Sequence, residues 1–174
     1  MGDVPYEIER KFLLAAPDGA VLDGLATSVS HIEQTYLRND DGQAERVRRR
    51  TVRRPGADGE TVTLTHTRKV GVSKGVVEEY ERELDEAEYG ELLQRSDADR
   101  VPVVKTRWVV RHDGRDWEVD HLVSPRDLWL MEVELPAADD VEAELEVPPW
   151  AHGVREVTGD DAYSNKNLAL PPSD

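Results

Sequence analysis

The sequence contains no cysteine among its 174 residues, which excludes disulfide bonds and thiolate chemistry. It has no apolar run long enough to cross a bilayer, and Glu7 and Glu9 interrupt the N-terminal stretch that a signal peptide would need. Positive charge is also scarce, because 22 Lys and Arg stand against 37 Asp and Glu, for a net charge of −15. Such a charge repels polyanions, so we expect a cytoplasmic protein that binds neither nucleic acid nor membranes.

Two common site signatures are missing as well. The five histidines are scattered without HxH or HExxH spacing, which disfavours a histidine metal centre. The stretch GVSKG at 71–75 lacks the GxxxxGK[ST] pattern of a P-loop, so we expect an ordinary loop there. The chemistry must therefore come from other residues.

Along most of the chain apolar and polar residues alternate, which is the period of a β-strand. The length suits one domain over residues 1–174. Helices are predicted at 18–27, at 139–146 and at 85–96, the last with Asp85 as N-cap and Leu92 and Leu93 on its buried face. Eight strands are predicted at 4–14, 31–39, 44–52, 61–69, 76–84, 101–112, 115–123 and 128–135. Many short strands with few helices indicate an α+β fold, mainly antiparallel β, built on a barrel.

Phasing each strand shows charges of like sign at alternate positions, with apolar residues between them. In YEIERKFLL, the residues Glu7, Glu9 and Lys11 share one face. Acidic pairs recur at 79/81, 118/120 and 132/134, and basic pairs at 46/48 and 105/107. A solvated face would explain any single strand, but repeated like-charged pairs are unfavourable unless opposite charges lie across from them. We therefore expect the charges to line the lumen of the barrel, and Trp108, Trp117 and Trp129 to pack outside.

A lumen of this composition suits a polyphosphate. Lys and Arg bind phosphate oxygens, and clustered carboxylates bind a hard cation such as Mg²⁺ or Mn²⁺. Phosphoryl transfer by positioning and electrostatics is the expected chemistry. The run RVRRRTVRR also resembles a nucleic-acid patch, but strand phase turns Arg46 and Arg48 toward the lumen.

These residues resemble the CYTH superfamily, also called triphosphate tunnel metalloenzymes. EIERK fits its ExExK signature, and the similarity continues in register through QTYL at 34–37, ERVRRR at 45–50, TRK ending at Lys69, EYE at 79–81, KTRW at 105–108, EVD at 118–120, EVEL at 132–135 and EVTGDDAYSNKNLAL at 156–170. The chain looks most like the small bacterial inorganic tripolyphosphatases. The resemblance implies an eight-stranded closed tunnel with a polar lumen and a few helices packed outside.

The resemblance also implies roles for individual residues. Triphosphate contacts fall to Lys11, Arg46, Arg48, Lys69, Lys105, Arg107 and Lys166, with Tyr36 lining the lumen. Metal binding falls to Glu7, Glu9, Glu79, Glu81, Asp120, Glu132 and Glu134, not all of them direct ligands. Glu7, Glu9 and Lys69 are the catalytic candidates, through metal ions that activate water. We expect Lys69, among carboxylates, to stay protonated.

The function implied is metal-dependent hydrolysis of a triphosphate, most simply inorganic tripolyphosphate to pyrophosphate and phosphate, and a homodimer is compatible with the family. One alternative is a class IV-type adenylyl cyclase that converts ATP to cyclic AMP. A thiamine or nucleoside triphosphatase and a non-catalytic polyphosphate sensor are others. The sequence shows no base- or ribose-binding motif, and its acidic pairs are intact, so hydrolysis is favoured. Arg10 should lie on the outer face, with no partner assigned to it.

Overall fold

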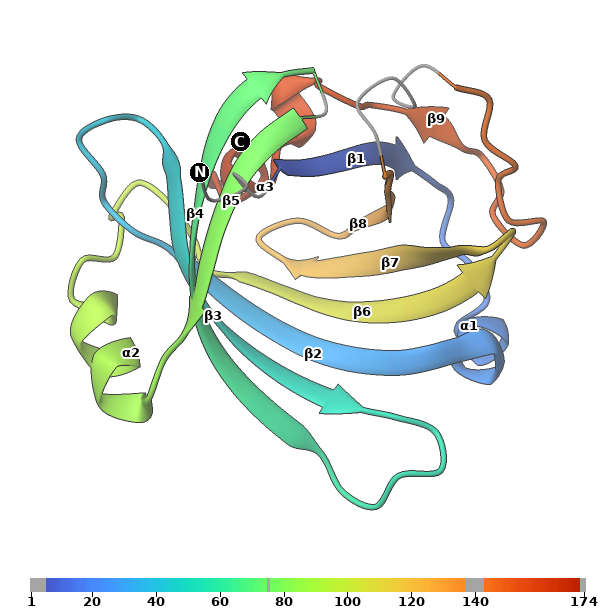
Figure 1. Ribbon diagram of the computed structural model, residues 1–174, viewed down its shortest axis with the longest axis horizontal. Helices are drawn as coiled ribbons and strands as arrows, with labels where there is room; N and C mark the ends of the chain where they lie inside the picture. The colour runs from blue at the N-terminus through green and yellow to red at the C-terminus, as the bar shows by residue number, and fades with distance from the viewer. Residues whose placement is uncertain (1–5, 75, 137–142, 173–174) are drawn as a thin grey trace.

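The computed structural model describes residues 6–74, 76–136 and 143–172, apart from the side chains of Tyr6 and Glu7. Within these residues nine strands form one antiparallel sheet, in the order β5-β4-β3-β2-β6-β7-β8-β1-β9 (Figure 1). The strands are β1 (Tyr6–Leu13), β2 (Ala26–Tyr36), β3 (Ala44–Arg53), β4 (Thr61–Ser73), β5 (Val76–Glu83), β6 (Val103–His112), β7 (Arg115–Ser124), β8 (Leu128–Glu134) and β9 (Arg155–Glu156). Pairing of β1 with β5 closes the first eight into a barrel, so the predicted fold is confirmed.

The first helix and the second strand differ in position from the prediction. Helix α1 (Gly19–Leu25) starts after Asp18, whose side chain accepts a hydrogen bond from the backbone N of Ala20 at 2.9 Å. Strand β2 follows at once from Ala26, five residues before the predicted start at 31. Its first lumen-facing residues are the buried Ser28 and Ser30, which give a weaker alternation signal than charge does.

The apolar faces of β1, β6, β7 and β8 form a core on the outside of the barrel. Trp117 and Val119 are fully buried in it, and α1 covers it with Leu22. Trp108 donates its indole N–H to Asp23 of α1 at 2.8 Å, which satisfies the polar atom of a buried ring. Trp129 packs against the same core. The prediction that these tryptophans lie outside the lumen is therefore confirmed.

Helix α2 (Glu86–Leu93) begins with a capping box, in which Asp85 and Glu88 each accept a hydrogen bond from the other's backbone N. It lies beside β3 and β4 with no buried residue, so Leu92 and Leu93 are only half-buried and that prediction was wrong. The short η2 (Asp161–Tyr163) and α3 (Asn165–Leu168) follow β9. None of the helices among the described residues is long and apolar enough to span a membrane.

Two further local predictions need correction. Residues 143–146 are not helical, and the prolines that follow them disfavour a helix there. The rest of the predicted helix at 139–146 lies outside the described residues. In the stretch predicted as a loop, Gly71–Ser73 continue β4 and Lys74 forms the turn, whereas Gly75 is not described.

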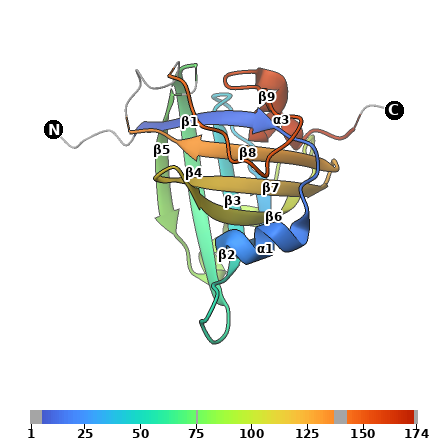
Figure 2. The same ribbon diagram turned by 90° about the vertical axis from the view of Figure 1, so that its right-hand side faces the viewer.

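One end of the barrel is filled by apolar side chains. Tyr36, Leu122 and Leu130 point inward from their strands and pack against Leu168 and Ala169 of the C-terminal segment. In Figure 2 the C-terminal part of the chain, with β9 and α3, lies toward the end of the molecule to which β1 points. The C-terminal segment therefore closes this end, and the charged positions of the strands line the space behind it.

Candidate active site

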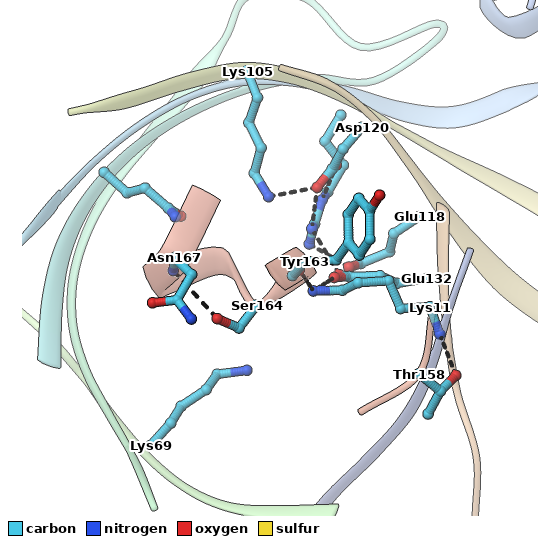
Figure 3. Close-up of polar contacts among 12 residues, drawn as sticks. Lys11, Lys69, Lys105, Glu118, Asp120, Glu132, Thr158, Tyr163, Ser164 and Asn167 are labelled. Atoms are coloured by element: carbon cyan, nitrogen blue, oxygen red, sulfur yellow. Dashed lines mark hydrogen bonds and ion pairs between the residues drawn. The ribbon is translucent and has the colours of Figure 1, made fainter. Parts of the chain in front are cut away.

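The lumen is lined by the charged positions that alternation predicted. On neighbouring strands, Arg48 stands in register between Gln34 of β2 and Thr65 of β4, and Arg107 of β6 stands beside Asp120 of β7. Figure 3 shows Lys105 and Lys69 extending into the interior from opposite walls, while Glu118, Asp120 and Glu132 gather on one side. The paired charges therefore face inward rather than toward solvent.

Asp120 bridges the two cations of the basic pair of β6. Its two oxygens accept hydrogen bonds from Arg107 Nε and Nη2 at 2.6 and 2.7 Å, and its Oδ2 lies 2.5 Å from Lys105 Nζ. All three side chains are buried. Burial alone would raise the pKa of Asp120, but Arg107 and Lys105 hold it below its usual range. Both oxygens are occupied by cations, so the structure adds no support to the predicted metal-ligand role of Asp120.

Glu132 joins the basic and acidic parts of the lumen. Its Oε1 lies 2.9 Å from Lys11 Nζ, and its Oε2 accepts a hydrogen bond from Arg107 Nη2 at 3.2 Å. These cations overcome the effect of burial and hold the pKa of Glu132 well below its usual range. The Lys11 ammonium also donates to the carbonyl of Tyr163 at 3.2 Å. A phosphate and a metal ion entering here would each replace part of an existing ion pair.

The surroundings of Glu9 disfavour its negative charge, so a bound cation would stabilise the ionised carboxylate. Burial and the nearby charge of Glu132 raise its pKa, although Lys69, Lys11 and Arg107 act in the opposite direction. Six carboxylates line one cavity of about 790 Å³ at the open end, namely those of Glu9, Asp113, Asp116, Glu118, Glu132 and Glu134. In the described part of the chain, no three acidic or imidazole groups already converge on one point. The donor set nevertheless fits a hard divalent cation, which would relieve the repulsion at Glu9.

The surroundings of Arg48 disfavour its positive charge, so a bound anion would stabilise the guanidinium. Its Nε is buried without a hydrogen-bond partner, and its Nη2 meets only the neutral amide oxygen of Gln34 at 3.4 Å among the described contacts. Burial lowers the pKa of Arg48 to about 9, and the charges of Arg46 and Arg107 add to this effect. The buried hydroxyl of Thr65, next to Arg48 on β4, also lacks a partner. An anion bound between these groups would satisfy them.

Two more side-chain contacts join the neighbouring strands β4 and β5 on their lumen face. Lys69 Nζ lies 2.8 Å from Glu79 Oε2, and Thr67 donates its hydroxyl to Glu81 at 2.8 Å. Lys69 therefore lies beside a carboxylate, as predicted, while Glu79 and Glu81 face the lumen with it.

The remaining predicted site residues divide into three cases. Tyr36 lines the closed end, where its hydroxyl accepts a hydrogen bond from Gln34 at 3.4 Å. Lys166 donates to the carbonyls of Gly42 and Gln43 at 2.7 and 3.3 Å, so its predicted phosphate contact stays a prediction. The side chain of Glu7 lies outside the described part of the structure.

Three contributors were not among the predicted site residues. Gln34 bridges Arg48 and Tyr36, Glu118 forms an ion pair with Arg107, and the Tyr163 backbone meets Lys11. Glu118 could have been found, because it shares the acidic face of its strand with Asp120. A backbone carbonyl carries no sequence signal.

Comparison with known proteins agrees with this geometry. The CYTH domain family matches residues 5–157. A curated protein of Acetivibrio thermocellus named inorganic triphosphatase is 32% identical over 167 residues, which is 95% of this chain and 94% of that protein. The crystal structure of the inorganic triphosphatase NE1496 is 29% identical, with a TM-score of 0.54 over 95% of this chain and 97% of that one. A structure from Pyrococcus horikoshii, PH1819, shares the fold at 22% identity, with a TM-score of 0.52 over 78% and 81% of the two chains. The chain belongs to the CYTH domain family.

Proposed function

We propose that this protein hydrolyses inorganic triphosphate to pyrophosphate and phosphate. The observation that carries the proposal is Arg48, a half-buried lumen residue whose Nε is buried without a hydrogen-bond partner. The charges of Arg46 and Arg107 disfavour its own positive charge, and the more weakly acting Glu81 and Glu118 favour it. Burying a polar N–H group without a hydrogen-bond partner is costly, so such a site is organised for an anionic ligand. The relatives named inorganic triphosphatase, which this chain matches over nearly its whole length, support the same substrate.

The residues of the chain would bind and orient the substrate. Phosphate oxygens would be met by the lumen cations, namely Lys11, Arg46, Arg48, Lys69, Lys105 and Arg107. Asp120 holds the Arg107 guanidinium by two hydrogen bonds, which fixes its plane before substrate arrives. Because little reorganisation is then needed, these donors can stabilise the charge that develops on the phosphoryl group during transfer.

A divalent cation would complete the site. Glu9, Glu132 and Glu134 are the residues that would hold it, with Glu79 and Glu81 on β5, which pairs with β1. A bound Mg²⁺ or Mn²⁺ would supply a water molecule of lowered pKa as the nucleophile. Glu9 and Glu132 would keep the ion on the open side of the lumen, away from the apolar closed end.

A cyclase or a nucleoside triphosphatase would also have to grip a nucleoside. The described residues that line the open cavity include Arg111, Asp113, Arg115 and Asp116, and none of them is aromatic. A base or a thiamine ring would therefore find no aromatic stacking partner on these residues, which favours an inorganic substrate. A cytoplasmic location and a homodimer stay predictions.

Phosphate release from tripolyphosphate, pyrophosphate, ATP and thiamine triphosphate, with Mg²⁺, Mn²⁺ or a chelator, tests the proposal. We expect the fastest release from tripolyphosphate, loss of activity in the chelator, and a large loss in Glu9→Gln. Glu78→Gln, which alters the outer face of β5, is the matched control and should retain activity. Chromatography of the ATP reaction separates ADP from cyclic AMP. Absence of turnover for every triphosphate would overturn the proposal.

A further inference from the structure

Arg10 lies between Glu9 and Lys11 but points to the opposite side of β1. Its Nε and Nη2 donate to the two carboxylate oxygens of Glu156, both at 2.8 Å. Nη1 donates to the carbonyl of Ala143, and the guanidinium lies 5.6 Å from the centre of the Phe12 ring. Only 9% of Arg10 is exposed, whereas 38% of the Glu156 side chain is. The guanidinium half of this two-point contact is therefore shielded from solvent, unlike that of an ordinary surface ion pair.

The contact continues from Glu156 to the backbone of Lys11. The hydroxyl of Thr158 donates to Glu156 Oε1 at 2.8 Å and accepts a hydrogen bond from Lys11 N at 3.0 Å. The backbone N of Val157 donates to the carbonyl of Lys11 at 2.8 Å. Both backbone polar groups of Lys11 are therefore bonded to residues 157–158, directly after the residue that Arg10 holds.

Residues 155–158 also form part of the barrel wall. On one edge β1 pairs with β8 through Glu9–Leu13. On the other edge β5 covers only Tyr6–Ile8, and β9 covers Phe12 and Leu13. The wall beside Lys11 is thus supplied by the C-terminal segment, and the same segment places the Tyr163 carbonyl on the Lys11 ammonium.

We propose that the Arg10–Glu156 ion pair is a positioning clamp, which holds residues 155–158 against β1 and so fixes Lys11 for triphosphate binding. This inference rests on the proposed function for its effect on binding. Arg49 and Glu86 provide the matched comparison, because they form a similar two-point pair at 2.8 and 3.0 Å. That pair is more exposed and joins β3 to α2 on the outside of the barrel.

Kinetics with tripolyphosphate test the clamp. If Lys11 loses part of one charge-assisted contact with phosphate, Arg10→Met should raise KM about tenfold and leave kcat within about twofold. Arg10→Lys keeps the positive charge but cannot donate two parallel hydrogen bonds to one carboxylate, so its KM should lie between those of Arg10→Met and the unaltered protein. The double variant Arg10→Met/Glu156→Gln should have the same KM as Arg10→Met, because both substitutions break the same Arg10–Glu156 contact. Arg49→Met and Glu86→Gln should leave KM unchanged.

Amide hydrogen exchange of the ligand-free protein tests the clamp without reference to catalysis. In Arg10→Met, the amides of Lys11 and Val157 should exchange at least about tenfold faster, while those of β6 stay unchanged. Unchanged exchange, an unchanged KM in the folded Arg10→Met variant, or additive KM effects in the double variant would each overturn the clamp. If the unaltered protein neither binds nor hydrolyses tripolyphosphate, the proposed function fails and with it the effect on binding. The exchange experiment would still decide whether Arg10 holds the segment.

Discussion

Lys11 of β1 and Glu132 of β8 face each other in register, with 2.9 Å between Nζ and Oε1. Both side chains are buried, and Glu132 also accepts a hydrogen bond from Arg107. In this structure the Glu132 carboxylate is thus paired with the same cations that would bind phosphate. A triphosphate that takes Lys11 releases Glu132 for a metal ion, and a metal ion at Glu132 releases Lys11. Binding of the two should therefore be mutually favourable.

Replacement of Glu132 by Gln should destabilise the protein. The change leaves Lys11 and Arg107 with less negative charge in a buried site, and breaking a buried ion pair costs about 3–5 kcal/mol. Urea denaturation should show a lower midpoint with an unchanged slope. Asp116→Asn breaks the exposed Arg111–Asp116 pair and should cost less than about 1 kcal/mol. Equal losses in the two variants would contradict the expected role of burial.

Removal of the charge of Arg48 should affect stability and binding in opposite directions. Arg48→Met relieves repulsion from Arg46 and Arg107, so we expect a gain of about 1 kcal/mol in the free energy of unfolding. Tripolyphosphate affinity should fall at least about tenfold, because a charge-assisted contact from the guanidinium is lost. Thermal denaturation and titration calorimetry measure the two effects. Arg49→Met, on the other face of β3, is the control, and a loss of stability in Arg48→Met would contradict the argument.

The faces of the strands were predictable from the sequence because alternation is a local property. Spacing shows which residues share a face with Lys11, Arg48 and Glu132, and the like-charged pairs that recur on several strands predict that this face points inward. The start of β2 was not predictable, because Ser28 and Ser30 face the lumen without charge.

The partners of the charged residues could not be predicted, because they depend on which segments meet in space. Arg10 and Glu156 are 146 positions apart, and nothing in either residue's neighbourhood specifies the other. In the same way, the resemblance to the CYTH superfamily implied a metal-binding role for Asp120. In the structure it is bonded to Lys105 and Arg107 of the adjacent strand.

The apolar closed end should contribute to stability through Leu168. This side chain is 1% exposed and packs with Tyr36, Leu122 and Leu130 inside the barrel. Leu168→Ala should therefore lower the free energy of unfolding by about 2–5 kcal/mol, through lost burial and the cavity that it leaves. Leu170→Ala, at a residue that is 37% exposed, should change it by less than about 1 kcal/mol. Denaturant unfolding followed by tryptophan fluorescence measures the free energy of unfolding of both variants. Similar losses in Leu168→Ala and Leu170→Ala would show that burial of Leu168 does not contribute to stability as expected.

Lys105 should make tripolyphosphate binding depend on pH. Burial lowers its pKa to about 8, and the charge of Arg107 adds to this effect. Between that value and the unfolded pKa near 10.4, the unfolded chain holds more protons, so the contribution of this group to stability rises with pH. Phosphate binding needs the ammonium form, so the affinity should fall about tenfold for each pH unit above roughly 8. Calorimetric titration across this range measures the fall. Lys105→Met should bind more weakly but with a smaller pH dependence, and the same dependence in both proteins would mean that another group titrates.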